Sequence, residues 1–207
     1  CLLFYRMGDF FELFFDDARE AAEILELTLT SRNRKDPDPI PMAGIPYHAL
    51  NGYLRRLVSA GRKVALAEQR APPEGSSKKL MDRELVRVVT PGIPWDTDTI
   101  AAREPCYLAA LWGRGPVGLA FLDSSTGQLC LTEVADLEQA CAEVLRMEPK
   151  ELILAPALSD VEEESLASLA HLPKTLGVHH RASREDGEES IRELLGRQDL
   201  MGLGIGA

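Results

Sequence analysis

The segment GDFFELFF, at residues 8–15, constrains the fold more than any other part of this 207-residue chain. It follows the apolar run LLFYRM and precedes DDAREAAEIL, which is acidic at its start and helical in its spacing. A segment this rich in aromatic side chains is typical of a buried strand. We therefore predict a strand over residues 2–14. A helix is expected to begin at Asp16 and Asp17, whose charges suit the positive end of the helix dipole.

Alternation along this strand divides its side chains into two sets. Residues two apart point the same way on a strand, so Phe10 and Glu12 share one face, and Phe11, Leu13 and Phe15 share the other. An aromatic ring beside a carboxylate can wedge into a base stack while the acid accepts a hydrogen bond from an exposed base edge. The simpler interpretation is that Phe10 belongs to the core and Glu12 is a solvated neighbour. On composition alone, the simpler interpretation is favoured.

The rest of the first half is predicted to alternate strands and helices. The expected elements are a short strand, a helix and two buried strands, at residues 27–32, 48–61, 63–69 and 84–90. PIPMAGIP, at residues 39–46, is interpreted as a compact segment held between prolines. The Pro-, Gly- and Ser-rich residues 71–79 are expected to form a flexible loop.

Three apolar runs open the second half, and turn signals separate them, which predicts an antiparallel meander. A helix and a further strand follow, and a crossover of this kind is typical of parallel pairing with the first strand. The three runs, the helix and the last strand lie at residues 106–112, 117–123, 128–134, 137–149 and 151–156. This is the ribonuclease H-like order. Two acidic helices are predicted beyond it, at residues 160–170 and 188–196.

The predicted fold class is therefore mixed α/β. We expect an N-terminal mixed-sheet α/β domain over residues 1–90, a linker over residues 91–103, and a ribonuclease H-like α/β domain over residues 104–207. The chain begins with Cys rather than Met, so we expect it to be part of a longer protein.

The net charge of −10 at first argues against DNA binding, but the charge is unevenly distributed. Residues 1–103 carry 15 basic and 15 acidic side chains, whereas residues 104–207 carry 8 and 18. Within residues 32–87 there are 12 basic side chains against 6 acidic ones. Only the first half therefore offers a cationic segment able to follow phosphates. Arg32, Arg34 and Lys35 are candidates for that contact, and the alternative is that they are ordinary solvated loop charges.

Several kinds of site lack their sequence signatures. The four cysteines show neither C-x-x-C nor histidine pairing at zinc spacing, and we interpret them as small hydrophobes in a reducing cytosol. The chain has no run of 18 apolar residues and no P-loop pattern. His179 and His180 have no third ligand in pattern, and GLGIGA at residues 202–207 is interpreted as a loop. We therefore predict no catalytic residue and no metal site in this region.

Three blocks of sequence carry a resemblance to a known family. LLFYRMGDFFELFFDDA, PIPMAGIPYHAL and RELVRVVTPG occur in the order and at the spacing found in the N-terminal region of the MutS family of DNA mismatch repair proteins. The resemblance is strong through Gly92 and weaker beyond it. It implies a mismatch-recognition domain followed by a connector domain with the ribonuclease H-like fold.

The resemblance also implies roles for particular residues. In the family, the Phe of a Phe-x-Glu motif stacks on a mispaired base from the minor groove, and the Glu hydrogen-bonds that base; here these are Phe10 and Glu12. The middle residue is usually Tyr and here is Phe11, which faces away on the strand. Met7 and His48 are further candidate DNA contacts, with Met42 a weaker one. The alternative for these three is packing or an ordinary surface position.

The partners implied are double-stranded DNA with mismatches or small loops, a MutL-type repair protein that binds the connector, and a second copy of the full-length protein. The family is an ATPase that uses ATP and Mg²⁺ in domains outside these residues, so no cofactor is expected in this region. We expect a cytoplasmic location and no membrane contact.

Two rival functions stay open. A metal-dependent ribonuclease H-like nuclease needs carboxylates around two metal ions, one of them on the first strand. CYLAALW has no acid, and Asp123 is expected to cap the turn that Ser124 and Ser125 begin. The other rival is a MutS-like protein that binds branched DNA without sensing mismatches, and the presence of Phe10 and Glu12 argues against it.

Overall fold

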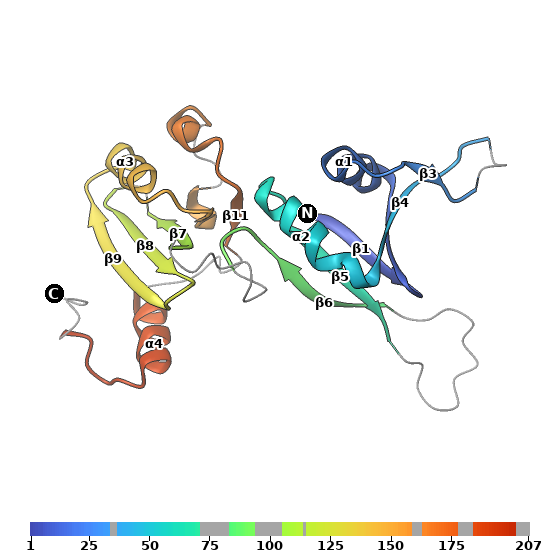
Figure 1. Ribbon diagram of the computed structural model, residues 1–207. Coiled ribbons are helices and arrows are strands. Elements are labelled where there is room, and N and C mark those ends of the chain that lie inside the picture. Colours follow the sequence, from blue (N-terminus) through green and yellow to red (C-terminus); the bar gives the residue numbers. More distant parts are fainter. Residues whose placement is uncertain are drawn as a thin grey trace.

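The computed structural model describes residues 1–33, 37–70, 83–93, 105–113, 115–158, 163–177 and 184–201. These residues form a six-stranded sheet from the first half and a five-stranded sheet from the second (Figure 1). Each sheet contains parallel and antiparallel pairs, so the predicted mixed α/β class is confirmed. The predicted loop over residues 71–79, most of the linker, His179, His180 and GLGIGA lie outside the described residues. No helix in the described ranges is long and apolar enough to cross a membrane.

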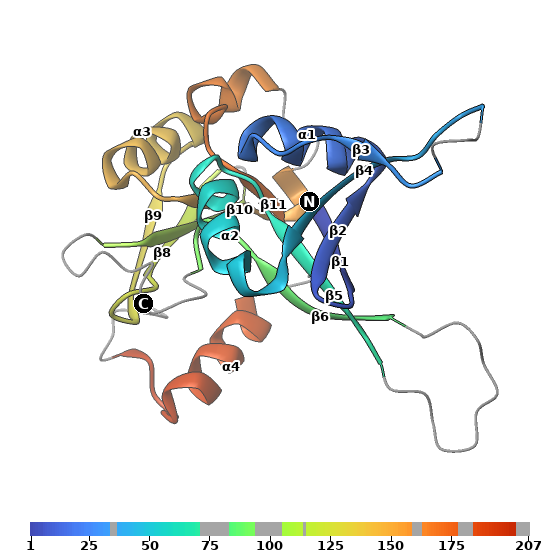
Figure 2. The ribbon, with the colours of Figure 1, turned by 45° about the vertical axis from the view of Figure 1, so that its right-hand side comes forward.

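The first sheet has the spatial order β3-β4-β2-β1-β5-β6. Its strands are β1 (Leu2–Met7), β2 (Phe10–Phe14), β3 (Thr30–Ser31), β4 (Pro41–Pro46), β5 (Val64–Gln69) and β6 (Arg83–Val89). β1 lies near the centre, antiparallel to β2 and parallel to β5. Figure 2 shows helices α1 (Phe15–Leu25) and α2 (Leu50–Ser59) on one side of this sheet. A short 3₁₀ helix, η1 (Tyr47–Ala49), leads into α2.

The core of this half lies between the sheet and the two helices. Phe4, Phe11 and Leu13 point toward the helices and are fully buried. Small residues of α1, such as Ala18 and Ala21, also have no exposed surface, which lets this helix lie close to the strands. Asp17 of α1 accepts a hydrogen bond of 2.9 Å from the main-chain N–H of Leu3, so the acidic start of the helix is also tied to β1.

The prediction of a single strand over residues 2–14 is wrong. The chain turns back at Gly8 and Asp9, so β1 and β2 form a hairpin in which Met7 lies opposite Phe10. Gly8 has φ +62°, a conformation that glycine adopts at little cost and that two-residue hairpin turns require. Apolar residues precede and follow Gly8 and Asp9, so the sequence has the pattern of one continuous strand at this turn. Phe15, predicted to share a strand face with the buried Phe11 and Leu13, is 60% exposed because its φ of +55° ends the strand and begins α1.

Three further segments differ from expectation. PIPMAGIP contains a regular strand, β4, whose first and last residues are Pro41 and Pro46. The helix predicted at residues 160–170 is described only from Glu163, where it is the 3₁₀ helix η4 (Glu163–Leu169). Strand β11 (Lys174–Leu176) has no predicted counterpart, because three residues are too few for alternation to show.

The second sheet has the order β11-β10-β7-β8-β9. The predicted meander corresponds to β7 (Tyr107–Trp112), β8 (Val117–Asp123) and β9 (Gln128–Val134). Helix α3 (Leu137–Met147) then crosses to β10 (Glu151–Leu154), which pairs parallel with β7. The predicted order of three antiparallel strands, a helix and a parallel strand is therefore confirmed. The 3₁₀ helix η3 (Pro156–Leu158) follows β10, and α4 (Arg184–Leu195) is the last helix described.

Asp123 ends β8 and caps the turn into β9, as the sequence predicts. Its Oδ1 accepts hydrogen bonds from the Ser125 hydroxyl at 2.7 Å and the Ser125 N–H at 3.0 Å. The Thr126 hydroxyl donates to Oδ2 at 2.9 Å, and the N–H of Cys106 donates to Oδ1 at 3.2 Å. These hydrogen bonds, led by that of the Ser125 hydroxyl, outweigh the opposing effect of burial and lower the pKa of Asp123 to about 2.

We predict that Asp123→Asn lowers the free energy of unfolding at neutral pH, because the amide cannot accept from all these donors. The folded-state pKa lies below the ordinary value of 3.8, so the carboxylate stabilises the fold fully above pH 3.8. This stabilisation is lost as pH falls through about 2. Urea denaturation of the parent and variant chains between pH 7 and pH 2 should show the difference shrinking with acid. Glu133→Gln, on the exposed strand β9, is the control, and a difference that did not change with pH would contradict the assignment.

Candidate nucleic-acid interface

Phe10 lies at the end of the β1–β2 hairpin, which we call the hairpin tip (Met7–Phe10). It is the first residue of β2 and 49% of its surface is exposed, whereas the adjacent Phe11 is fully buried. The prediction that these two rings take opposite faces is therefore confirmed. The turn contains only Gly8 and Asp9. The Phe10 ring therefore projects from the end of a strand that is paired on both sides, and not from a long loop.

Groups on both sides hold the turn in place. The Arg6 Nε donates a hydrogen bond to the carbonyl of Gly8, and the N–H of Tyr47 donates to the carbonyl of Asp9 at 2.8 Å. The Arg6 guanidinium lies over the Tyr47 ring, 3.5 Å from its centroid. That ring stacks on Phe11 with centroids 5.9 Å apart. This arrangement of a cation and two rings connects the turn to the core and limits its movement.

Glu12 lies two residues along β2 from Phe10, on the face of the first sheet opposite the two helices. We call this the open face, and it includes Tyr5, Phe10, Glu12 and Phe14. Glu12 pairs in register with Tyr5 on β1 and with Gly44 on β4. Its side chain is 22% exposed and forms an ion pair of 3.4 Å with Arg32, which follows β3. The Arg32 side chain is about half exposed.

Two arginines reach the open face from opposite edges of the sheet. Arg32 comes from the β3 side, and its guanidinium lies 5.6 Å from the centroid of the Phe14 ring. Arg83, at the start of β6, lies 5.9 Å from the centroid of the Tyr5 ring and contacts the sulfur of Met7 at 2.8 Å. The exposed ring of Phe10 and the carboxylate of Glu12 therefore have cationic groups on both sides, which suits a polyanionic ligand.

The structure brings together several of the predicted site residues. Met7 lies directly opposite Phe10, and His48 is exposed in η1 beside Tyr47. Met42 pairs with Phe14, at the end of β2 away from the tip, so it is not a neighbour of Phe10. Arg34 and Lys35 lie outside the described residues.

Sequence reasoning missed Arg6, Tyr47 and Arg83. Arg6 belongs to β1, Tyr47 directly follows β4, and Arg83 is the first residue of β6. In the sequence, each of them is therefore one residue of a strand or helix pattern, with nothing to mark it as a site residue. Their roles depend on contacts between segments about 40 and 76 residues apart in the chain. A cation in an otherwise apolar strand is the one local signal that could have drawn attention to Arg6.

Two family models match the chain, one to each sheet. MutS domain I matches residues 1–98, and MutS domain II matches residues 106–206. The chain belongs to the MutS family. The matched ranges include every strand described here.

Curated relatives agree with this assignment. The protein named DNA mismatch repair protein MutS from Desulfatibacillum aliphaticivorans is 52% identical over 154 residues, which cover 74% of this chain and 17% of that protein. The protein of the same name from Syntrophobacter fumaroxidans is 44% identical over 99% of this chain and 23% of its own length. That of Sorangium cellulosum is 47% identical over 82% of this chain and 19% of its own length. The chain thus spans about a fifth of the length of these MutS relatives.

We predict that Tyr47→Leu loosens the hairpin tip, whereas Tyr47→Phe does not. Leucine removes the ring between Arg6 and Phe11, and loss of a cation–π and a stacking contact should lower the free energy of unfolding by about 1–2 kcal/mol. Hydrogen exchange at the Tyr47 N–H, which donates to Asp9, should accelerate in the Leu variant alone. If exchange accelerated equally in Tyr47→Phe and Tyr47→Leu, the hydroxyl rather than the ring would be the group that supports the turn.

Proposed function

We propose that this region recognises mismatched base pairs in DNA and that Phe10 and Glu12 are the residues that do so. The observation that carries the proposal is the exposed Phe10 ring at a braced hairpin tip, with the Glu12 carboxylate next to it on the same face. The names of the MutS relatives support it, since all three are DNA mismatch repair proteins.

Phe10 would act as a wedge that enters the base stack from the minor groove. Inserting an apolar side chain between base steps costs unstacking energy, and that cost is lower where the bases are already poorly paired. Stacking of a base on the ring returns about 1–3 kcal/mol. A wedge must resist the push of the duplex, and the contacts of Arg6 and Tyr47 with the turn supply that resistance.

Glu12 would accept a hydrogen bond from the displaced base. A carboxylate acceptor gives a charge-assisted bond, stronger than one between neutral groups. On a normal duplex no such bond forms, and repulsion between the carboxylate and nearby phosphates disfavours binding. The ion pair between Glu12 and Arg32 is accessible to solvent, with the Arg32 side chain 49% exposed, and such a pair contributes about 0–1 kcal/mol. Arg32 can therefore leave Glu12 and pair with a phosphate when DNA binds.

Other residues would complete the contact. Met7 lies opposite Phe10 and His48 is exposed near the turn, so both can reach the same groove. Arg32, Arg34 and Lys35 would contact phosphates. The second sheet would relay the DNA-bound state toward ATPase domains that use ATP and Mg²⁺, and would offer a surface to a MutL-type partner. The full-length protein would act as a homodimer.

The rival nuclease function finds less support. Asp123 is occupied by the turn that it caps, and Glu151 is buried in an ion pair. Among the residues that the structure describes, no three His, Cys, Asp or Glu side chains gather as a metal site would require.

We predict that Phe10→Ala removes most of the preference for mismatched over matched duplexes. Loss of about 1–3 kcal/mol of stacking corresponds to a roughly 5- to 150-fold fall in that preference. Competition binding by a full-length MutS protein that contains this region is the measurement. Phe15→Ala is the matched control, because Phe15 is also an exposed ring, 60% accessible at the start of α1. A preference ratio unchanged by Phe10→Ala would refute the proposal.

Glu12→Ala should behave differently from Phe10→Ala. Removing an acid near phosphates relieves repulsion, so binding to fully matched DNA should hold or rise while the preference for mismatches falls. Glu23→Ala removes the same charge from the exposed side of α1 and should change neither quantity. A uniform loss of binding to both duplexes would instead identify Glu12 as a structural residue.

A further inference from the structure

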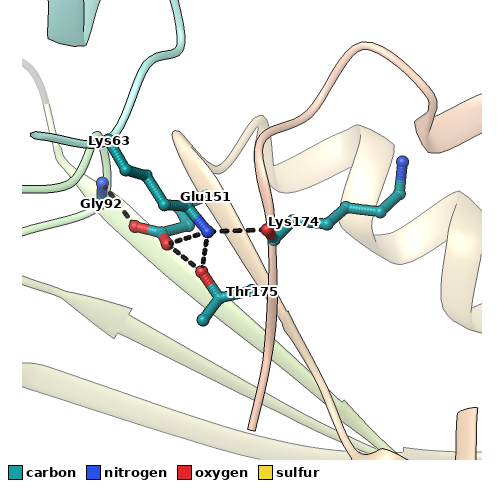
Figure 3. A network of polar contacts seen from close by, with 5 residues as sticks. All are labelled: Lys63, Gly92, Glu151, Lys174 and Thr175. Carbon is teal, nitrogen blue, oxygen red and sulfur yellow. Dashed lines mark hydrogen bonds and ion pairs between the residues drawn. The ribbon is translucent and has the colours of Figure 1, made fainter. Parts of the chain in front are cut away.

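Glu151, the first residue of β10, is a charged side chain buried far from the hairpin tip. Only 3% of its surface is exposed, yet it is surrounded by polar partners from three segments (Figure 3). The hydroxyl of Thr175 on β11 donates to its Oε1, and the N–H of Gly92 donates to its Oε2 at 3.2 Å. The Nζ of Lys63 lies 3.3 Å from Oε1. Lys63 and Gly92 belong to the first half of the chain, whereas Glu151 and Thr175 belong to the second.

Among the residues that the structure describes, the partners of the Lys63 ammonium group all lie in the second half. Besides Glu151, it donates to the carbonyl of Lys174 at 2.6 Å and to the hydroxyl of Thr175. An ammonium has three protons, and these three acceptors can take all of them. The side chain is only 20% exposed. Such a residue would lose its partners at once if the two halves separated, so the contact is specific to one arrangement of the two sheets.

Close packing surrounds this ion pair. A Cβ added to Gly92 would lie 2.7 Å from the Cδ1 of Leu108 and 2.8 Å from the Cβ of Glu151, so only glycine fits there. The carbonyl of Gly92 accepts a hydrogen bond of 2.6 Å from Ser124. Two residues before Lys63 in the chain, a Cβ added to Gly61 would lie 3.3 Å from the Cγ of Pro173. The main chain of the first half thus lies directly against the second sheet at two points.

The charge on Glu151 is maintained by its neighbours. Burial acts to raise the pKa of Glu151, but hydrogen bonds from Thr175 and Gly92 and the nearby charge of Lys63 outweigh it. The pKa of this carboxyl therefore lies below its ordinary value, and the group is ionised at neutral pH. Removing one partner of a buried ion pair leaves the other as an unpaired buried charge. Loss of Lys63 would therefore disfavour the contact between the two halves of the chain.

We propose that Lys63 is a positioning residue that fixes the orientation of the first sheet relative to the second through Glu151, Thr175 and the Lys174 carbonyl. The lysine stands directly before β5, and its own carbonyl accepts a hydrogen bond of 2.8 Å from Leu2 at the start of β1. β1 then runs to the hairpin tip. Five strand steps span about 17 Å, so a rotation of about 10° at Lys63 displaces the tip by about 3 Å. The proposal concerns the arrangement of the two sheets and stands independently of what the tip binds.

The test is the relative orientation of the two sheets in the 207-residue chain, measured by residual dipolar couplings of main-chain N–H groups. In the parent chain, couplings from β1, β2 and β5 should fit the same alignment tensor as those from β7, β8 and β10. In Lys63→Met the two sets should require different tensors. Chemical shifts within each sheet, away from residue 63, should stay unchanged, which separates loss of orientation from loss of fold.

Lys174→Met is the matched control. It removes the same charge from a residue whose main-chain carbonyl accepts from Lys63, and Figure 3 shows the exposed Lys174 side chain directed away from the network. The control should keep the single tensor. Should Lys63→Met fail to fold, Lys63→Gln retains a hydrogen-bond donor without the charge and should show the same divergence to a smaller degree. A common tensor in a folded Lys63 variant, or divergence in Lys174→Met as large as in Lys63→Met, would overturn the proposal.

Discussion

The two-residue turn at Gly8 and Asp9 sets the register on which the first sheet depends. With Met7 opposite Phe10, alternation sends Phe11 toward the helices and leaves Phe10 and Glu12 on the open face. A slip of one residue would exchange the two sets and bury the carboxylate while exposing a core ring. The turn is itself held from both sides, by the Arg6 side chain and by the N–H of Tyr47. Core, turn and exposed ring are therefore one structural unit.

Electrostatics on the open face follow from the same register. Glu12 is the acid beside the exposed ring, and Arg32 and Arg83 approach from the two edges of the sheet. The net charge of −10 is no obstacle to contact with a polyanion, because the excess of acidic residues lies after residue 103. In the proposed function, Glu12 and the phosphates would compete for Arg32, so the Glu12 carboxylate would become available only when DNA is present.

In the described part of the second half, two carboxylates are buried, and both serve the structure. Asp123 gathers hydroxyl and main-chain donors at the end of β8. Glu151 gathers donors from both halves of the chain at the start of β10. A buried carboxylate is tolerated only where such partners compensate for lost hydration. A sheet with the ribonuclease H-like strand order therefore carries acids that bind neighbouring segments.

Much of this architecture was determined by the sequence alone. Side-chain alternation is a local property, so it placed Phe10 and Glu12 on one face and Phe11 on the other, and it identified the meander and the crossover to β10. The acidic pair that opens α1 and the turn-capping role of Asp123 are local as well. Only the tertiary structure decided which distant residues meet: Tyr47 beneath Arg6, Arg83 beside Met7, and Lys63 on Glu151. The physical reason is that a charged or aromatic side chain has the same local pattern whether it is solvated or paired. Its partner is chosen by strand register and by the packing of one sheet against the other, which no short segment records.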